Sequence, residues 1–390
     1  KREGLLQCVY EKETAEFDIK TIKEAATLEV TGVLKQNEKA PNGIEITMQK
    51  VEILSEPEAE MMPLAISKWK LNTSLEAKLN YRSIALRNIR ERAKFRIQEG
   101  LTRAFRDFLY SQEFTEIHTP KIGAKGAEGG ANIFKLEYFH RPAVLAQSPQ
   151  FYKQMMVGVF DRVFETAPVF RAEKHNTKRH LNEYTSLDFE MGYIDGFEDI
   201  MAMETGYLQY AMELLQKEYA KELKILGVEL PDVSRIPAVR FHDIKEIVSE
   251  KYGHKMRNPF DLEPEEEQLI GKYAKEEWGS DFVFVTHYPS KKRPFYAMDD
   301  PEDSKYTLSF DLLFKGLEIT TGGQRIHDYQ KLIEKIEARG METDGMDQYL
   351  ATFRHGMPPH GGIGIGLERL TMQLIGEDNV RETTLFPRDL

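Results

Sequence analysis

Two apolar segments that bracket a loop rich in cationic side chains constrain this chain more than any other feature. The apolar positions are Phe164, Val169 and Phe170 before the loop and Leu187 and Phe189 after it, and the loop itself carries Arg, Lys and His. This pattern predicts an antiparallel hairpin with positive charge at its tip. Its strands can hold a site rigidly, with four side chains as candidates: Arg171, Glu173, Tyr184 and Asp188. A solvated loop on an ordinary sheet is the alternative, and the hairpin alone does not decide between them.

The composition indicates a folded protein of two or three domains without a membrane span. Of 390 residues, 41% are hydrophobic and 30% are charged, and no apolar run approaches the length that a bilayer requires. The single cysteine, Cys8, excludes a disulfide framework, and no Cys/His cluster has zinc-site spacing, so we expect a cytoplasmic location. The chain begins Lys-Arg-Glu-Gly without a methionine or a signal sequence, so we expect residues upstream. A net charge of −11 gives no general indication of nucleic-acid binding but permits a local basic surface.

Three regions follow one another along the chain. Residues 1–55 contain strand patterns at 5–10, 27–34 and 44–53 and predict the later part of a small β-barrel. Residues 56–80, with scattered prolines and charges, predict a linker or hinge. Residues 81–390 mix helix and strand patterns with few βαβ repeats, which favours an antiparallel α+β domain over a doubly wound one. The helices expected there span residues 82–112, 150–158, 197–226, 242–251, 264–277 and 366–374, and the strands span 114–119, 282–287, 308–314 and 317–320.

A glycine-rich strand precedes the last expected helix. In His360-Gly-Gly-Ile-Gly-Ile-Gly-Leu-Glu-Arg369, the glycines would let backbone approach a ligand, and the helix N-terminus favours anions. A dinucleotide-binding fingerprint should instead open the first βαβ unit and precede an acidic ribose ligand by about 20 residues. This run lies close to the other end of the sequence, so we reject that interpretation. We interpret Arg369 as a phosphate contact, although a surface arginine is the commoner role.

Three segments together resemble the motifs of the class II aminoacyl-tRNA synthetases. Phe114-Thr-Glu-Ile-His-Thr-Pro120 resembles motif 1, Phe170-Arg-Ala-Glu173 resembles motif 2, and Gly364-Ile-Gly-Leu-Glu-Arg369 resembles motif 3. Between them, Gln147-Ser-Pro-Gln-Phe-Tyr-Lys-Gln154 and Gly322-Gly-Gln-Arg-Ile-His327 are similar to signatures of the aspartyl-tRNA synthetases of archaeal and eukaryotic type. The resemblance covers essentially the whole chain. It implies a six-stranded antiparallel catalytic sheet with flanking helices, an N-terminal OB-fold barrel that binds the anticodon, and a homodimer built on motif 1.

The resemblance implies ATP-dependent attachment of L-aspartate to the 3′ end of tRNA(Asp) through an aspartyl-adenylate. That reaction brings two anions together, the amino-acid carboxylate and the α-phosphate. By resemblance Arg171 bridges them, while Arg369 and His180 meet the γ-phosphate. Glu173 would accept from the adenine amino group, and Tyr184 would stack on adenine where the family often has phenylalanine.

The resemblance also implies a magnesium site on two neighbouring strand ends. Asp311 and Glu318 would hold Mg²⁺ through oxygen ligands against the polyphosphate. Thr321 stands where the family often has serine, and its hydroxyl is retained. Taken alone, such a pair is equally typical of ordinary strand-end carboxylates.

The substrate implied by the resemblance is aspartate. Lys153 and Arg325 match the cations that meet its side-chain carboxylate, and arginine offers a fork that fits a carboxylate. The other expected contacts are Asp188 and Glu128 for the α-ammonium group, and Gln150 as an orienting hydrogen-bond partner. Asparagine would leave the two cations without their partner in a desolvated pocket, so we reject an asparagine-specific enzyme as the closest relative.

Two residues of the barrel bear on the choice of tRNA. Gln7 stands where the family places a glutamine that reads the central anticodon base. Pro41 stands where relatives that discriminate the third base tend to carry lysine and the others tend to carry proline. Proline offers no donor to a base edge, although both residues are also ordinary strand and turn residues. We therefore expect tRNA(Asn) to be charged as well as tRNA(Asp).

Two other functions fit parts of this pattern. A free-standing, ammonia-dependent asparagine synthetase would form the same adenylate without RNA, and the barrel segment at residues 5–53 argues against it. A catalytically inactive RNA-binding paralogue would have lost the residues for ATP and metal. Those residues are all present: Arg171, Glu173, Asp311, Glu318 and Arg369.

Overall fold

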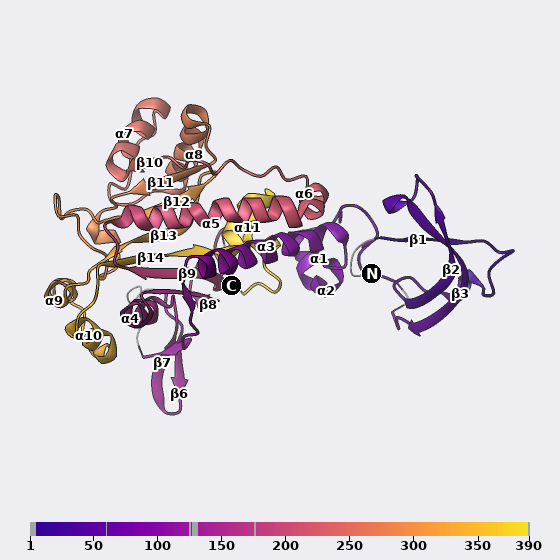
Figure 1. Cartoon of the computed structure of the whole chain (residues 1–390), viewed down its shortest axis with the longest axis horizontal. Helices are drawn as coiled ribbons and strands as arrows, with labels where there is room; N and C mark the ends of the chain where they lie inside the picture. Colours follow the sequence, from indigo (N-terminus) through magenta and orange to yellow (C-terminus); the bar gives the residue numbers. More distant parts are fainter. Residues whose placement is uncertain (1–4, 60, 125, 127–131, 175–176, 389–390) are drawn as a thin grey trace.

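The computed structural model describes residues 5–59, 61–124, 126, 132–174 and 177–388. Glu128, expected to bind the α-ammonium group, lies outside these described residues. Figure 1 shows a small three-stranded unit at one end of the long axis and a larger body, built on one broad sheet, at the other. Among the described residues, no helix has the length and apolar character to cross a bilayer.

The small unit contains the three strands expected in the first 55 residues. They are β1 (Gln7–Tyr10), β2 (Thr27–Gln36) and β3 (Ile44–Ser55). Strand β3 lies in the middle, parallel to β1 and antiparallel to β2. The turn before β3 holds Asn42 at a φ of 61°, which asparagine tolerates better than most residues. Asn42 Nδ2 donates to the carbonyl of Leu5 at 2.9 Å, so this turn is bound to the start of β1.

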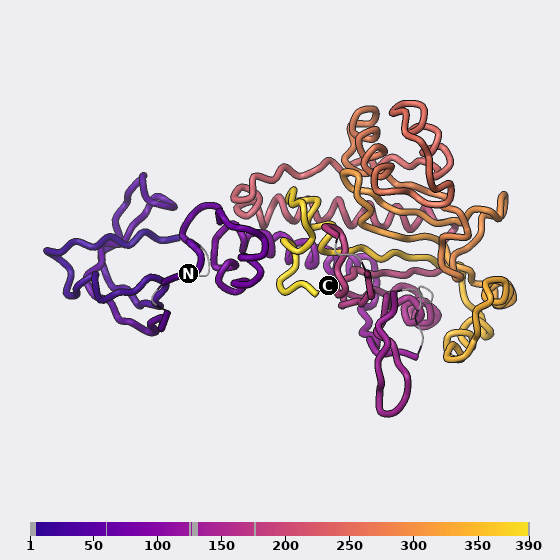
Figure 2. The backbone as a smooth tube through the Cα atoms, turned by 180° about the vertical axis from the view of Figure 1, so that it is seen from behind, coloured from indigo at the N-terminus to yellow at the C-terminus, as the bar shows by residue number. Residues whose placement is uncertain are grey.

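The expected linker ends earlier than residue 80. Helix α1 (Leu75–Asn80) follows a stretch whose described residues form no helix or strand. Its buried Lys78 contacts a carboxylate oxygen of Glu382 at 2.5 Å. Helix α2 (Arg82–Ala85) comes next, and the C-terminal residues lie beside these helices in Figure 2. The long helix expected from residue 82 therefore begins only at α3 (Ile89–Ser111). The side chain of Asn88 accepts from two backbone N–H groups of its first turn, which fixes the start there.

The large sheet has eight strands in the order β10-β11-β12-β13-β14-β9-β8-β4. Six of them, from β11 to β8, are antiparallel neighbours, as predicted. Strands β10 and β4 add one parallel strand at each edge, and β4 is shorter than the strand expected at residues 114–119. The strands are β4 (Thr115–Glu116), β8 (Arg162–Phe170), β9 (Glu183–Gly192), β10 (Ala238–Arg240), β11 (Phe282–Thr286), β12 (Ser309–Phe314), β13 (Leu317–Arg325) and β14 (His360–Gly366).

The main core lies between the sheet and helices α3 and α5, which run side by side in Figure 1. The ring of Phe105 on α3 packs edge-to-face against Phe164 of the sheet and Tyr207 of α5, at 5.9 and 5.1 Å between centroids. All three residues are fully buried. Burying one aromatic or aliphatic side chain of this kind contributes about 1.5–3 kcal/mol. The helices around the sheet are α4 (Gln150–Phe160), α5 (Phe197–Glu218), α6 (Ala220–Leu226), α7 (Phe241–Tyr252), α8 (Pro264–Trp278), α9 (Tyr329–Ala338), α10 (Asp347–Arg354) and α11 (Leu367–Ile375).

Several elements differ from the expectations. The helix expected at residues 197–226 is divided into α5 and α6 at Tyr219. Helices α9 and α10 were not expected. Neither was a small sheet of β5 (Ile122–Gly123), β6 (Lys135–Tyr138) and β7 (Arg141–Leu145).

Candidate active site

Two cavities meet on the face of the sheet formed by β9, β13 and β14. The smaller has a volume of about 210 Å³ and the larger about 590 Å³. They share the lining residues Arg171, Tyr184, Glu318, Thr321, Gly364 and Gly366. A Cβ atom at Gly364 would come within 3.1 Å of Asp188 Oδ1, so glycine keeps this floor open. The five residues expected to contact ATP line the smaller cavity, as does Glu318, which was expected at both the ATP and the magnesium. Gln150, Lys153, Asp188 and Arg325 line the larger cavity.

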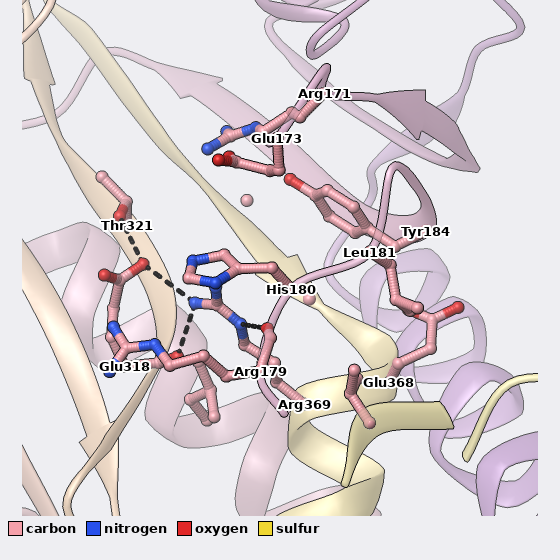
Figure 3. Close-up of a pocket in the computed structure, with 14 residues that line it drawn as sticks. Arg171, Glu173, Arg179, His180, Leu181, Tyr184, Glu318, Thr321, Glu368 and Arg369 are labelled. Carbon is pink, nitrogen blue, oxygen red and sulfur yellow. Dashed lines mark hydrogen bonds and ion pairs between the residues drawn. The ribbon is translucent and has the colours of Figure 1, made fainter. Parts of the chain in front are cut away.

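The predicted hairpin forms one wall of both cavities. Strands β8 and β9 pair in an antiparallel ladder that ends at Phe170 and Glu183, and the Arg171 N–H extends it by donating to Asn182 O at 2.9 Å. The guanidinium carbon of Arg171 lies 5.9 Å from the centre of the Tyr184 ring. Figure 3 shows Arg171, Glu173 and the Tyr184 hydroxyl together at one end of the smaller cavity. A cation, a carboxylate acceptor and an aromatic face are therefore available to one ligand.

The other end of the smaller cavity is strongly cationic. Arg369 donates from Nε to Arg179 O and from Nη1 to Glu318 O, both at 3.1 Å, which fixes its guanidinium beside His180 (Figure 3). Burial and the positive charge of Arg369 lower the pKa of His180 to about 4. The imidazole is therefore neutral at pH 7 and can accept as well as donate a hydrogen bond.

Sequence reasoning missed the support for this cationic end. Arg179 binds the carboxylate of Glu267 with both terminal nitrogens, at 3.0 and 2.9 Å. Glu368 is buried and accepts from the backbone N–H of Thr185 with both oxygens, which ties α11 to β9. Burial raises the pKa of Glu368 to about 7. The residue types were visible in the loop and in motif 3, but their partners lie 88 and 183 positions away in the sequence.

The residues expected to bind magnesium are only partly brought together. Thr321 Oγ1 lies 3.4 Å from Glu318 Oε1, and both residues line the two cavities. Burial raises the pKa of Glu318, but Arg369 and neighbouring arginines outweigh this effect, and the net shift is downward. The carboxylate of Glu318 is therefore anionic and offers the oxygen ligands that Mg²⁺ prefers.

Asp311 differs from its expected position at a strand end. It lies within β12, opposite Thr321, and lines neither of the two cavities. Its Oδ1 is 2.8 Å from Nη2 of Arg293, whose guanidinium stacks 3.8 Å from the Tyr288 ring centre. Burial raises the pKa of Asp311 to about 6 despite this partner. A metal contact by Asp311 would share this carboxylate with Arg293.

A buried row of alternating charges forms the floor of the larger cavity. Lys153 Nζ donates to Asp188 Oδ1 at 2.9 Å and to Ile363 O at 2.8 Å, and it lies 3.3 Å from Glu190 Oε2. Arg325 Nε donates to Glu190 Oε1 at 3.0 Å. Burial raises the pKa of Glu190, but the charges of Arg325 and Lys153 outweigh this effect, and the net shift is downward. Glu190 is therefore anionic. Lys153 was expected to meet the substrate directly, yet it is already surrounded by carboxylates.

Glu190 is a further residue of the site that sequence reasoning missed. It lies two residues after Asp188 on β9, so both side chains occupy the same face of the strand. That period of two was the available signal. Gln150 also lies at this cavity, and its buried Nε2 has no hydrogen-bond partner among the residues described.

The two residues expected at the anticodon lie at one end of the small sheet. Gln7 is exposed at the start of β1, and its Nε2 donates to Glu45 Oε2 at 3.0 Å. Pro41 opens the turn whose Asn42 is bound to Leu5, so the turn and the start of β1 are neighbours.

The chain is similar to known proteins along almost all of its length. The sequence profile of the tRNA synthetases class II (D, K and N) matches residues 74–390. The aspartate–tRNA(Asp/Asn) ligase of Deinococcus radiodurans is 48% identical over 370 residues, which cover 93% of this chain and 85% of that protein. The aspartate–tRNA(Asp) ligase of Pyrococcus furiosus is 40% identical over 395 residues, which cover 100% of this chain and 89% of that protein. The crystal structure of asparaginyl-tRNA synthetase from Pyrococcus horikoshii with asparaginyl-adenylate superposes with a TM-score of 0.90 at 30% identity. The superposition covers 100% of this chain and 89% of that one.

Proposed function

Because this chain belongs to the class II tRNA synthetases for aspartate, lysine and asparagine, we propose that it activates L-aspartate with ATP and transfers it to tRNA. The observation that carries this proposal is the position of Arg171, which lines both cavities where they meet. A guanidinium there can contact the substrate carboxylate and the α-phosphate at the same time.

In the first step a carboxylate oxygen of aspartate forms a bond to the α-phosphorus, and the bond from that phosphorus to the bridging oxygen of pyrophosphate breaks. Arg171 neutralises both anions and holds them in line, which lowers the cost of bringing them together. Arg369 and the neutral His180 contact the departing phosphates at the far end of the smaller cavity. The ring of Tyr184 and the carboxylate of Glu173 bind the adenine. In the second step a hydroxyl group of the tRNA 3′ end attacks the aspartyl carbonyl and AMP leaves.

Aspartate is favoured over asparagine by the charges at the larger cavity. More Lys and Arg side chains than carboxylates line the larger cavity, which favours a substrate with two carboxylates. The cations are Lys153, Arg171, Lys291, Lys292, Arg293, Arg325 and Arg339, and the carboxylates are Asp188, Asp261 and Glu318. ATP–pyrophosphate exchange measured with each amino acid tests this assignment. We expect exchange with aspartate, and a comparable rate with asparagine would refute it.

We propose Glu318 and Thr321 as magnesium ligands, with Asp311 as a third ligand whose carboxylate also pairs with Arg293. Their oxygen donors fit Mg²⁺, and a bound ion would supply positive charge against the triphosphate. Exchange should therefore stop when a chelator removes divalent ions and return when Mg²⁺ is added in excess. Exchange that persists in the chelator would exclude this role.

We propose a homodimer that forms through motif 1, which contains the short edge strand β4, together with helix α3, which precedes it. Sedimentation at micromolar protein concentration should show a species of twice the chain mass of 45.1 kDa. A single species at the chain mass would remove this proposal and leave the catalytic site unaffected.

We also propose a cytoplasmic location, because the single cysteine suits a reducing compartment.

We propose that both tRNA(Asp) and tRNA(Asn) are charged. Gln7 and the turn at Pro41 lie at one end of the small sheet, and Pro41 offers no donor with which to select the third anticodon base. The test is aminoacylation of both purified transcripts. Charging of tRNA(Asn) that is about a thousandfold weaker, equivalent to roughly 4 kcal/mol, would show strict specificity.

A further inference from the structure

A histidine and two glutamates converge where α7 connects to α8, on the side of the body that carries β10 and β11 (Figure 1). His254, Glu263 and Glu266 each offer one ligand atom, and these atoms lie within 4.8 Å of one another. Within the ranges that the structure describes, this is the one grouping of three or more His, Cys, Asp or Glu side chains that could hold a metal ion. None of the three lines the cavities of the candidate active site.

The imidazole of His254 is buried between two carboxylates. Its side chain is only 8% exposed, with Nδ1 3.7 Å from Glu265 Oε1 and Nε2 3.8 Å from Glu266 Oε1. These separations exceed hydrogen-bond length, and the buried Nε2 has no hydrogen-bond partner among the described residues. A neutral imidazole that donates from Nδ1 would direct a lone pair from Nε2 at a carboxylate oxygen. Such a contact is favourable only if a proton or a metal cation lies between the two atoms.

The first turn of α8 holds Glu266 in a fixed position. Its Oε2 accepts from the backbone N–H of Glu263 at 2.8 Å and from Lys245 Nζ at 2.5 Å, while Oε1 remains directed at His254. Lys245 also donates to the carbonyls of Asn258 and Asp261, at 2.9 and 2.7 Å, so its ammonium group is anchored on the Oε2 side. The pocket is therefore organised before any ligand enters.

We propose that His254, Glu263 and Glu266 bind one divalent ion of the zinc class, with Glu265 as the outer partner of Nδ1. One imidazole and two carboxylates form a donor set that zinc accepts, and a carboxylate on the second nitrogen fixes the tautomer that binds metal. Zinc bonds of about 2.0–2.2 Å place tetrahedral neighbours roughly 3.4 Å apart, close to the 3.8 Å between His254 and Glu266. Three glutamates against Lys245 leave the pocket with a net negative charge that attracts a dication.

The ion acts on structure, because it joins the segment after α7 to the first turn of α8. That turn continues with Glu267, which holds Arg179 at the candidate active site, and the joined segment contains Asp261, which lines the larger cavity. Binding should order this wall and raise the temperature of unfolding. It should leave aspartate activation measurable without the ion.

The experiment measures Co²⁺ binding to the full chain, in excess Mg²⁺ so that oxygen-ligand sites are occupied. His254→Gln removes the nitrogen ligand, and Glu263→Gln removes one carboxylate at a different position. His242→Gln is the matched control, because His242 also faces two carboxylates but its side chain is 62% exposed. Glu265→Gln changes only the outer partner of the imidazole.

Wild type and His242→Gln should bind one more Co²⁺ per chain than His254→Gln and should show the visible absorption of low-symmetry cobalt. Glu265→Gln should weaken binding by about tenfold and Glu263→Gln by more. Equal Co²⁺ stoichiometry in wild type and His254→Gln would overturn the proposal. A second test follows the protonation of the His254 ring by NMR, and the same titration curve with and without equimolar Zn²⁺ would also overturn it. Aspartate-dependent exchange, measured on the same preparations, reports separately on the proposed function.

Discussion

Arg325 is the side chain whose replacement most directly tests the role of the buried charges. It is 5% exposed, donates to the fully buried Glu190 at 3.0 Å and to Gly362 O at 3.0 Å, and stacks on the Tyr296 ring. Arg325→Leu keeps much of the volume and leaves Glu190 with Lys153 as its remaining cationic neighbour. Breaking one buried pair in this way costs roughly 3–5 kcal/mol.

The same change removes a cation from the larger cavity. If the loss is felt fully by the transition state for aspartate activation, 3–5 kcal/mol corresponds to a fall in kcat/KM of roughly 200- to 5,000-fold. ATP–pyrophosphate exchange at varied aspartate concentration gives kcat/KM, and urea unfolding gives the free energy of unfolding. Arg354→Leu, at an exposed position on α10, is the control and should change neither quantity appreciably.

A double variant separates folding from catalysis. Adding Glu190→Gln to Arg325→Leu neutralises the carboxylate that lost its partner, so much of the free energy of unfolding should return. Aspartate activation should stay low, because the guanidinium is still absent. Recovery of kcat/KM in the double variant would show that Arg325 serves only to neutralise Glu190, and a single variant within tenfold of wild type would refute the assignment altogether.

Three further predictions concern other parts of the domain. Arg171→Ala should abolish aspartate-dependent exchange while the melting temperature stays near that of wild type; full activity would show that the site is misplaced. Burial raises the pKa of Glu204 to about 8. The unfolded chain releases this proton above about pH 4.5 while the folded state retains it, so the free energy of unfolding falls as the pH rises from about 4.5 to 8. Glu204→Gln should therefore gain up to about 4 kcal/mol over wild type near pH 8 and little near pH 5 in urea unfolding. Burial lowers the pKa of His360 to about 4, so the unfolded chain takes up the proton first and stability is lost as pH falls from 6.5 to 4, by up to about 3 kcal/mol. In His360→Gln that part of the pH dependence should disappear from the same unfolding measurements.

The elements with a strong local pattern were predictable from the sequence. Helix α3 repeats apolar residues along one face, and β8 and β9 alternate around a charged loop, so each carries its own signal. Helices α9 and α10 have 10 and 8 residues and bury only two side chains each, which is too short a pattern to stand out. The break before α3 depends on the N-cap Asn88, and the spacing of apolar residues alone does not predict where such a cap begins a helix.

The candidate site was predictable in its residue types and less so in its pairings. The motifs identified Lys153 and Arg325 as cations. Their burial against Glu190 depends on packing between elements, however, and for Arg325 the two strands are 135 positions apart in the sequence. Asp311 shows the same limit, because its partner Arg293 lies in an irregular segment without a motif. Resemblance identifies which residues matter, whereas long-range packing determines what each one contacts.

The order of strands in the large sheet has a consequence for how this chain is made. Strand β14 lies in the middle of the sheet, between β9 and β13, yet it follows the other seven strands of this sheet in the sequence and so leaves the ribosome after them. Until residues 360–366 emerge, only two half-sheets can form, β10 to β13 and β9 with β8 and β4, and the edges of β13 and β9 lack their partner strand. Such edges are open to pairing with other chains, and contacts between distant residues form slowly. The most vulnerable period of synthesis therefore comes shortly before the glycine-rich strand arrives to join the halves.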